Sequence, residues 1–241
     1  MNNTIPSVIS AMRIVEMLAA APEGASQSRL AVSAGLSAST CYRILQSFAA
    51  HGWALKDTQG AWRLGAGLMP VVAALRLQVA GIDAMRRILN GIAARESIAC
   101  KVSIRSGEQQ IVAVRAEPPG EMQATGNEGS RFPVAEGSSG AALLADLPVE
   151  EAVALLRATP KSQTDVRFLR SSLADLRKSG WCGRRHIAAW PIAALSAPIR
   201  QADGSIVAAL TFLVPDSRFD DTSLPPLLLE TAQKCELKME N

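Results

Sequence analysis

The stretch LAVSAGLSASTCYRILQSFAAHGWALKDTQGAWRLG, residues 30–65, decides the fold of the N-terminal part of the chain. A short helix ends within it at Gly35, because glycine most readily adopts the left-handed conformation that ends a helix. A second helix begins at Ser37, whose hydroxyl can accept a hydrogen bond from the first helical turn. Two short helices joined by a tight turn that contains glycine are typical of a helix-turn-helix.

The helix predicted over residues 37–50 has two different faces. Its apolar residues recur at i, i+3, i+4 and i+7 and should pack inward; they are Cys41, Ile44, Leu45 and Phe48. At about 100° per residue, polar side chains lie on the opposite face; they are Ser39, Arg43, Gln46 and Ser47, flanked by Thr40 and Tyr42. Arg43 and Gln46 are residue types that make bidentate contacts with guanine and adenine edges in the major groove. An ordinary solvated helix face uses the same residue types.

Two short alternating segments, Trp53–Lys56 and Ala61–Leu64, follow this helix and flank a turn over residues 57–60. The alternation predicts a two-stranded wing whose inward-facing residues are Trp53, Leu55, Trp62 and Leu64. Lys56 and Arg63 should then point outward and are candidates for phosphate contacts, although either could simply be solvated. The candidates for DNA contact are therefore Ser37, Ser39, Thr40, Tyr42, Arg43, Gln46, Ser47, Lys56 and Arg63.

Upstream of the quoted stretch, apolar residues recur at helical spacing over residues 6–20 and predict a first amphipathic helix; they are Val8, Met12, Val15 and Ala19, with Ile14 and Leu18 alongside. Residues 22–24, Pro-Glu-Gly, end this helix. Ser26 or Ser28 then caps the short helix that ends at Gly35.

Composition limits the class of protein. The chain has 241 residues, 48% of them apolar and 20% charged, which suits a globular protein of two domains. The cysteines are scattered without a CxxC motif, and this predicts a reducing cytoplasm and neither a disulfide framework nor a zinc site. The sequence shows no signal peptide and no apolar run of about 18 residues, so we expect a soluble cytoplasmic protein without a membrane span. No cofactor is expected.

Charge is unevenly distributed along the chain. Residues 1–80 contain six basic and three acidic residues, whereas the remainder contains equal numbers of both signs. The whole formal excess of +3 therefore lies in the first third. This asymmetry gives mild support to nucleic acid as the partner of that part alone.

The quoted stretch, preceded by Ser7-Val8, resembles the DNA-binding domain of the IclR family of bacterial regulators. The resemblance rests on the pattern Gly-Leu-x-x-Ser-Thr-x-Tyr-Arg-x-Leu at residues 35–45, on Gly-Trp at 52–53 and on Arg-Leu-Gly at 63–65. Two later segments extend it over nearly the whole chain. They are FPVAEGSSGAALLA, residues 132–145, and GWCGRRHIAAWPIAALSAPIRQADGSIVAALTFLVP, residues 180–215.

The resemblance implies an α+β protein with three parts: a winged helix-turn-helix domain (1–65), a linker helix (66–80) that helps dimerisation, and a GAF-like effector domain (81–241). The last part should contain an antiparallel sheet flanked by helices. The resemblance also implies a closing helix near 224–238. The pattern itself predicts a helix over 82–95, strands over 99–105 and 110–115, and a loop over 117–130. The implied partners are double-stranded operator DNA of pseudo-palindromic sequence, a small-molecule effector, and further copies of the chain as a dimer or a dimer of dimers.

Carried over position by position, the resemblance implies an effector pocket lined by Ser138, Ser139, Arg184, Ala194, Thr211 and Leu213. The two serines would lie at a helix N-terminus, where exposed N–H groups attract anions, or would merely cap that helix. Core packing is the alternative for Ala194 and Leu213. The chain has Arg184-Arg185-His186 where family members typically carry acidic residues. Such a loop favours an anionic organic acid if it lines the pocket, but two arginines could equally be solvated.

Two rival functions follow from the same residues. A constitutive DNA-binding dimer would use its second domain for oligomerisation alone. An enzyme is disfavoured because the sequence lacks GxSxG, P-loop and HExxH motifs and a GxGxxG motif after a strand. Cys182 and His186 do not form a catalytic pair on an extended strand, where residues four apart are separated by about 13 Å.

Overall fold

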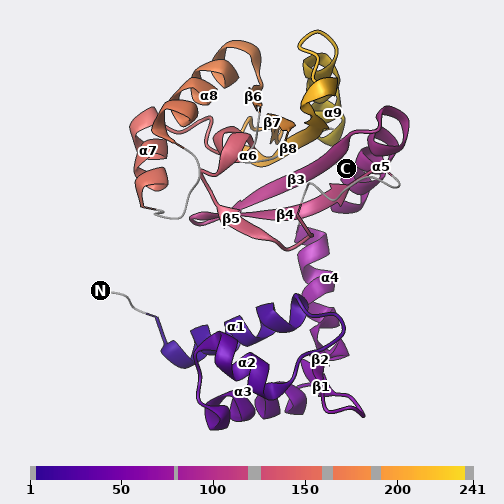
Figure 1. The fold of residues 1–241 in the computed structure, drawn as a ribbon, viewed down its shortest axis with the longest axis vertical. Helices are drawn as coiled ribbons and strands as arrows, with labels where there is room; N and C mark the ends of the chain where they lie inside the picture. Colours follow the sequence, from indigo (N-terminus) through magenta and orange to yellow (C-terminus); the bar gives the residue numbers. More distant parts are fainter. Residues whose placement is uncertain (1–3, 79–80, 119–125, 159–164, 186–190, 237–241) are drawn as a thin grey trace. The chain divides into compact units, whose positions relative to one another are not determined.

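The computed structural model describes residues 4–78, 81–118, 126–158, 165–185 and 191–236 (Figure 1). Contacts divide the chain into two compact units, residues 1–78 and residues 79–241. The break between them falls within the segment predicted as the linker. Parts of three predicted segments lie outside the described residues, as does His186. These parts are residues 79–80 of the linker, 119–125 of the predicted loop and 237–238 of the last helix.

The first unit is a helix-turn-helix followed by a short hairpin and a further helix. Its elements are α1 (Pro6–Ala19), α2 (Gln27–Ala34), α3 (Ala38–Ala50), β1 (Ala54–Lys56), β2 (Trp62–Leu64), the 3₁₀ turn η1 (Ala66–Leu68) and α4 (Met69–Gln78). Fully buried side chains from α1, α2, α3 and β2 form one apolar core, which includes Ile14, Leu18, Leu30, Leu45 and Trp62.

The helix boundaries in this unit follow from local chemistry. The Ser26 hydroxyl accepts a hydrogen bond from the backbone N–H of Arg29 at the start of α2. Gly35 ends that helix with φ 67°, a left-handed conformation that glycine adopts without a steric penalty. The Ser37 hydroxyl then accepts from the N–H of Thr40 and so caps α3. The predicted turn between the two helices is confirmed.

The predicted inward faces of the wing and of the first helix need correction. Leu55 and Leu64 are exposed, whereas Ala54 and Trp62 are buried. The N–H of Trp53 still donates to the carbonyl of Phe48, so Trp53 belongs to the corner after α3 and the strand's inward face begins one residue later. Val8 and Met12 of the first helix are likewise exposed.

The second unit is an antiparallel sheet covered by helices on both faces, which confirms the predicted α+β class. Among the described residues, six strands form this sheet in the order β5-β4-β3-β8-β7-β6 (Figure 1). They are β3 (Ala99–Ser106), β4 (Gln109–Ala116), β5 (Arg131–Pro133), β6 (Cys182–Arg184), β7 (Ile192–Arg200) and β8 (Ile206–Pro215). No helix in the described part of the chain is long and apolar enough to cross a membrane.

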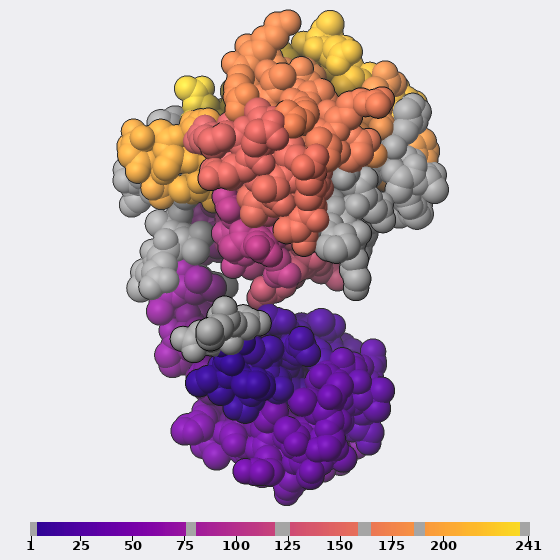
Figure 2. All heavy atoms as spheres, turned by 90° about the vertical axis from the view of Figure 1, so that its left-hand side faces the viewer, coloured from indigo at the N-terminus to yellow at the C-terminus, as the bar shows by residue number. Residues whose placement is uncertain are grey.

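The helices divide between the two faces of this sheet. One face is covered by α5 (Ile82–Glu96) and α9 (Leu224–Glu236), which bury an apolar cluster that includes Val102, Leu195 and Phe212. The 3₁₀ turn η2 (Asp216–Arg218) leads from β8 towards α9. The other face is covered by α6 (Gly137–Leu143), with α7 (Val149–Arg157) and α8 (Val166–Ser179) outside it. Figure 2 shows the outer surface that α7 and α8 form.

The sequence pattern did not predict α7 and α8. Both bury an amphipathic stripe in the apolar cluster that also contains α6, and Leu169 and Leu173 of α8 are fully buried. Asp165 caps α8 by accepting from the N–H of Phe168. α8 packs on α6 and α7 packs on α8, so the α6 side of the sheet is an interior surface.

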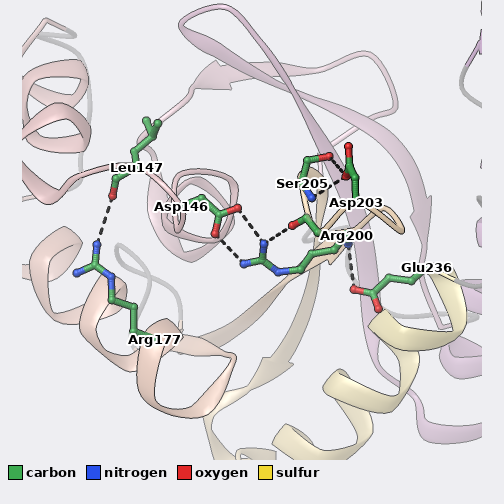
Figure 3. Close-up of polar contacts among 8 residues, drawn as sticks. Asp146, Leu147, Arg177, Arg200, Asp203, Ser205 and Glu236 are labelled. Carbon is green, nitrogen blue, oxygen red and sulfur yellow. Dashed lines mark hydrogen bonds and ion pairs between the residues drawn. The ribbon is translucent and has the colours of Figure 1, made fainter.

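One arginine joins elements from both sides of the sheet at the end of β7. The Arg200 guanidinium donates to both carboxylate oxygens of Asp146, at 2.8 Å each, and its backbone N–H donates to Glu236 Oε1 of α9 at 2.9 Å (Figure 3). The Arg200 guanidinium holds the pKa of Asp146 below its usual value. Beside it, Arg177 of α8 donates to the carbonyl of Leu147.

Candidate DNA-binding surface and effector site

The outward face of α3 is polar, and the side chains at its centre make no polar contacts with other described residues. Cys41 and Leu45 are fully buried and anchor the helix, which leaves Arg43 and Gln46 exposed on the other side. Within the described residues, neither of these two side chains has a hydrogen bond or an ion pair. The guanidinium of Arg43, which donates, and the amide of Gln46, which donates and accepts, are therefore available to bond the edges of base pairs.

The hydroxyls of α3 are arranged differently. The Ser37 hydroxyl lies 2.9 Å from Thr40 Oγ1 and 3.1 Å from Ser39 Oγ, so the three hydroxyls form a cluster at the first turn. The Ser47 hydroxyl donates to the carbonyl of Arg43 one turn earlier. Tyr42 is exposed beside this cluster. The small cluster leaves the helix N-terminus open to close approach by a phosphate.

The two basic residues of the wing have different surroundings. The Arg63 guanidinium forms an ion pair with Asp57 (Nε to Oδ2, 3.1 Å) and donates to the carbonyl of Pro22. Hydrogen bonds from the backbone N–H of Ala61, from Arg63 and from the N–H of Gln59 lower the pKa of Asp57. Lys56 is exposed and has no such ion pair in the described residues. Lys56 therefore remains the stronger candidate for a phosphate contact, whereas the contacts of Arg63 brace the turn.

Strand register brings most of the predicted effector residues into two adjacent rows. Arg184 of β6 pairs with Ala194 of β7, which pairs with Leu213 of β8. In the next row, Ser196 of β7 pairs with Thr211 of β8. Directly opposite residues of an antiparallel sheet point to the same face, so all five side chains lie on the α6 side.

Hydroxyl groups connect this face to α6. Ser196 Oγ donates to Ser138 Oγ at 2.9 Å and lies within hydrogen-bond distance, 2.9 Å, of Thr211 Oγ1. Ser138, Ser196 and Thr211 are all buried and together form what we call the hydroxyl chain. The structure therefore brings Ser138 and Thr211 together through Ser196, a residue that sequence analysis did not identify.

Ser139 has a separate set of partners. Its hydroxyl donates to Gln110 Oε1 at 2.8 Å, and Gln110 Nε2 donates to the carbonyls of Pro133 and Glu136. The N-cap of α6 is Glu136, and no side chain caps the helix. Helix capping by Ser138 or Ser139 is therefore excluded, and both serines attach α6 to the sheet instead.

The arginines at the end of β6 stack on aromatic rings. The Arg184 guanidinium carbon lies 5.0 Å from the centre of the Phe168 ring, and that of Arg185 lies 4.9 Å from the centre of the Phe219 ring. Each contact supplies the arginine with a favourable neighbour other than an anion. Their role in an effector pocket, together with that of His186, stays a prediction.

An open cleft of about 410 Å³ lies beside Arg185, between the end of α8 and Phe219. Its walls carry charges of both signs, from Asp175, Lys178, Arg185 and Asp221. None of the six predicted effector residues lines it. Cys182, which lines the cleft, also donates to the carbonyl of Ser138, so the cleft adjoins the interior surface under α6.

Lys101, which was not among the predicted residues, lies on the same interior surface. Lys101 of β3 pairs directly with Thr211 of β8. Its ammonium nitrogen is 5.2 Å from the centre of the Phe132 ring, and burial lowers its pKa to about 8. A lysine inside the otherwise apolar start of the strand, ACKV, was the available signal.

Two family descriptions match the chain. The IclR helix-turn-helix domain matches residues 7–58, and the bacterial transcriptional regulator IclR C-terminal domain matches residues 76–240. A curated relative, the HTH-type transcriptional regulator Rv1719 of Mycobacterium tuberculosis, is 28% identical over 221 residues, which cover 89% of this chain and 84% of the relative.

Solved structures show the same fold. An IclR transcriptional regulator from Alicyclobacillus acidocaldarius matches with a TM-score of 0.79 at 23% identity, over 98% of this chain and 99% of that one. An IclR homologue from Microbacterium hydrocarbonoxydans, solved in complex with 4-hydroxybenzoate, matches with a TM-score of 0.76 at 23% identity, over 97% and 99%. The predicted resemblance is confirmed. The chain belongs to the IclR family of bacterial transcriptional regulators, in which a helix-turn-helix DNA-binding domain precedes an effector-binding C-terminal domain, and which is not a family of enzymes.

Proposed function

We propose that the protein binds a pseudo-palindromic operator as a dimer and that an anionic organic acid modulates this binding. The observation that carries the proposal is the exposed face of α3, where Arg43 and Gln46 have no partner among the described residues while Cys41 and Leu45 anchor the helix. Two such helices in a two-fold dimer would enter successive major grooves about 34 Å apart.

Some residues of the first unit would contact bases and others would contact phosphates. Arg43 would read guanine and Gln46 adenine through bidentate hydrogen bonds. Lys56 of the wing and the hydroxyl cluster at the start of α3 would contact phosphates and fix the register of the protein on the duplex. We infer a cytoplasmic location, since the four cysteines are free and buried, as suits a reducing compartment.

Exposed apolar side chains on α4 support the dimer. Met69, Val71 and Leu75 are exposed by 61%, 52% and 55%, and Val8 and Met12 of α1 by 50% and 57%. Neighbouring apolar side chains left open to water on one helix typically mark a contact with another protein. The occupant we propose is a second copy of this chain, because a two-fold operator requires a two-fold protein.

The double substitution Val71→Asp, Leu75→Asp is expected to convert the dimer to a monomer, because each new carboxylate would lose its water at the interface. Sedimentation equilibrium of the full chain measures the result. Val32→Asp is the matched control, since Val32 is 81% exposed on α2, outside the proposed interface. A double variant that remains dimeric at the same concentration contradicts the assignment of α4 to the interface.

The polar interior surface of the second unit supports an anionic effector. The hydroxyl chain offers donors, and the structural relative from Microbacterium hydrocarbonoxydans was solved with the aromatic acid 4-hydroxybenzoate. We infer that this chain likewise responds to an organic acid, with Ser138, Ser139, Arg184, Ala194, Thr211 and Leu213 around the ligand. The ligand can change operator affinity only as far as it binds the two arrangements of the dimer differently.

Two measurements test the proposed function. Fluorescence anisotropy with DNA from the promoter region of the protein's own gene should reveal specific binding that greatly exceeds binding to random duplex at the same salt concentration. A panel of organic acids should then raise the melting temperature, since a ligand at a hundred times its Kd adds about 2.7 kcal/mol to stability. Operator binding without a response to any acid would favour the constitutive DNA-binding dimer instead.

A further inference from the structure

The middle of β3 contributes two polar side chains to the interior surface under α6. Lys101 lies directly opposite Thr211 of β8, and Thr211 lies opposite Ser196 of β7, so all three side chains share a face. Ser103 is two residues further along β3 and therefore lies on that face too. Lys101 and Ser103 thus stand next to the hydroxyl chain of Ser138, Ser196 and Thr211.

The charge of Lys101 is not compensated by any acidic side chain in the described part of the protein. Its neighbour on the other side, Arg115 of β4, takes Glu117 as its own ion-pair partner at 3.0 Å and bonds Asn127 at 2.8 Å. The Lys101 ammonium lies over the Phe132 ring, 5.2 Å from its centre. A half-buried lysine without a carboxylate is a typical feature of a site that binds an anion.

Ser103 provides a second and independent observation. Its exposed fraction is 0%, and its hydroxyl has no hydrogen-bond partner in the described residues. Buried hydroxyls are nearly always hydrogen-bonded, so an unsatisfied one beside an uncompensated ammonium indicates a shared ligand. Both groups can donate, and a carboxylate is an acceptor with two oxygens.

We propose that Lys101 and Ser103 bind the carboxylate of the effector, while the hydroxyl chain contacts the remainder of the ligand. This inference rests on the proposed function, because it assigns the ligand-binding groups of the same site. It adds a residue pair from β3 to a site predicted only from α6 and the strands β6, β7 and β8. It also defines the ligand class as a small carboxylic acid rather than a neutral molecule.

The test compares Lys101→Met with the wild-type full chain by isothermal titration calorimetry. The probes are benzoate, 4-hydroxybenzoate, pyruvate and succinate, each beside its neutral amide. We expect the wild type to bind at least one acid more tightly than the matching amide. Lys101→Met should bind that acid about 10- to 150-fold more weakly, which is the loss of one charged hydrogen bond.

Two further variants serve as a control and as a second test of the site. Lys234→Met removes a lysine from α9 on the opposite face of the sheet, where it pairs with Glu230, and should leave acid binding unchanged. Ser103→Ala removes a single hydroxyl and should weaken binding of the acid more than binding of the amide, even if Lys101→Met fails to fold.

The outcomes separate this inference from the proposed function. A wild-type chain that binds none of the four acids overturns both. A chain that binds an acid, with Lys101→Met or Ser103→Ala binding it equally well, overturns only the assignment to β3. Equal loss of acid and amide binding in Ser103→Ala would show that this residue shapes the site without contacting the carboxylate.

Discussion

Arg43→Ala should weaken binding to the operator by about 5- to 150-fold, which corresponds to the 1–3 kcal/mol of one bidentate contact with a base. The side chain is exposed and has no partner among the described residues, so the variant should fold as the wild type does. Anisotropy titrations at fixed salt against operator and random duplex measure both effects. The loss should be confined to operator DNA, because Arg43 is assigned to a base rather than to a phosphate.

One other arginine variant and one lysine variant provide the comparison for Arg43→Ala. Arg167→Ala removes one exposed arginine from α8 in the second unit and should leave operator binding unchanged. Lys56→Ala should weaken binding to both duplexes and lower the salt dependence by about one unit, as expected of a phosphate contact. If Arg43→Ala retains the full preference for operator over random DNA, α3 does not read the sequence through this residue.

Gly140→Ala is expected to destabilise the second unit, although alanine normally stabilises a helix relative to glycine by about 0.5–1 kcal/mol. A Cβ at position 140 would lie 2.4 Å from the carbonyl oxygen of Val134 and 2.7 Å from the carbonyl carbon of Ala135. Both are backbone atoms, so α6 would have to move, at a cost of about 1–3 kcal/mol or more. The melting temperature should fall by about 2–4 °C per kcal/mol in a chain of this size.

Gly91→Ala in α5 is the matched control, because a Cβ there would meet only the Arg95 guanidinium at 3.4 Å. That flexible side chain can move away, so the substitution should stabilise the protein by about 0.5–1 kcal/mol. Calorimetry of the two variants should therefore give shifts of opposite sign. Equal shifts would mean that α6 can adjust freely. A displaced α6 would also carry Ser138 and Ser139 with it, and Gly140→Ala should weaken the response to organic acids.

Local signals were sufficient to predict the helix-turn-helix. Ser26, Gly35 and Ser37 act within one or two turns of their own positions, so a single sequence can reveal them. The wing was predicted one residue out of phase in its first strand. Trp53 stacks on Phe48, with ring centres 5.9 Å apart, and this contact between α3 and the corner that follows it is not encoded in the alternation itself.

The residues of the candidate effector site come together through information that the sequence does not hold locally. Ser138, Ser196 and Thr211 are brought together by strand register and by the placement of α6, and only the resemblance supplied two of the three. Ser103 and Lys101 lie in a strand that the pattern predicted well. That the Lys101 ammonium has no acidic partner and the Ser103 hydroxyl no hydrogen-bond partner in the described residues became evident only when their neighbours across the sheet were known.

The Arg200 contacts have a mechanical consequence. Asp146 and Arg200 have side chains that are 52% and 36% exposed, so their ion pair adds little to the free energy of unfolding. Arg200 nevertheless holds the segment after α6 through its side chain and the last turn of α9 through its backbone N–H. If the segment after α6 or the last turn of α9 opens, it breaks a hydrogen bond to Arg200, which also holds the other. Local unfolding at this corner should therefore involve both faces of the sheet together.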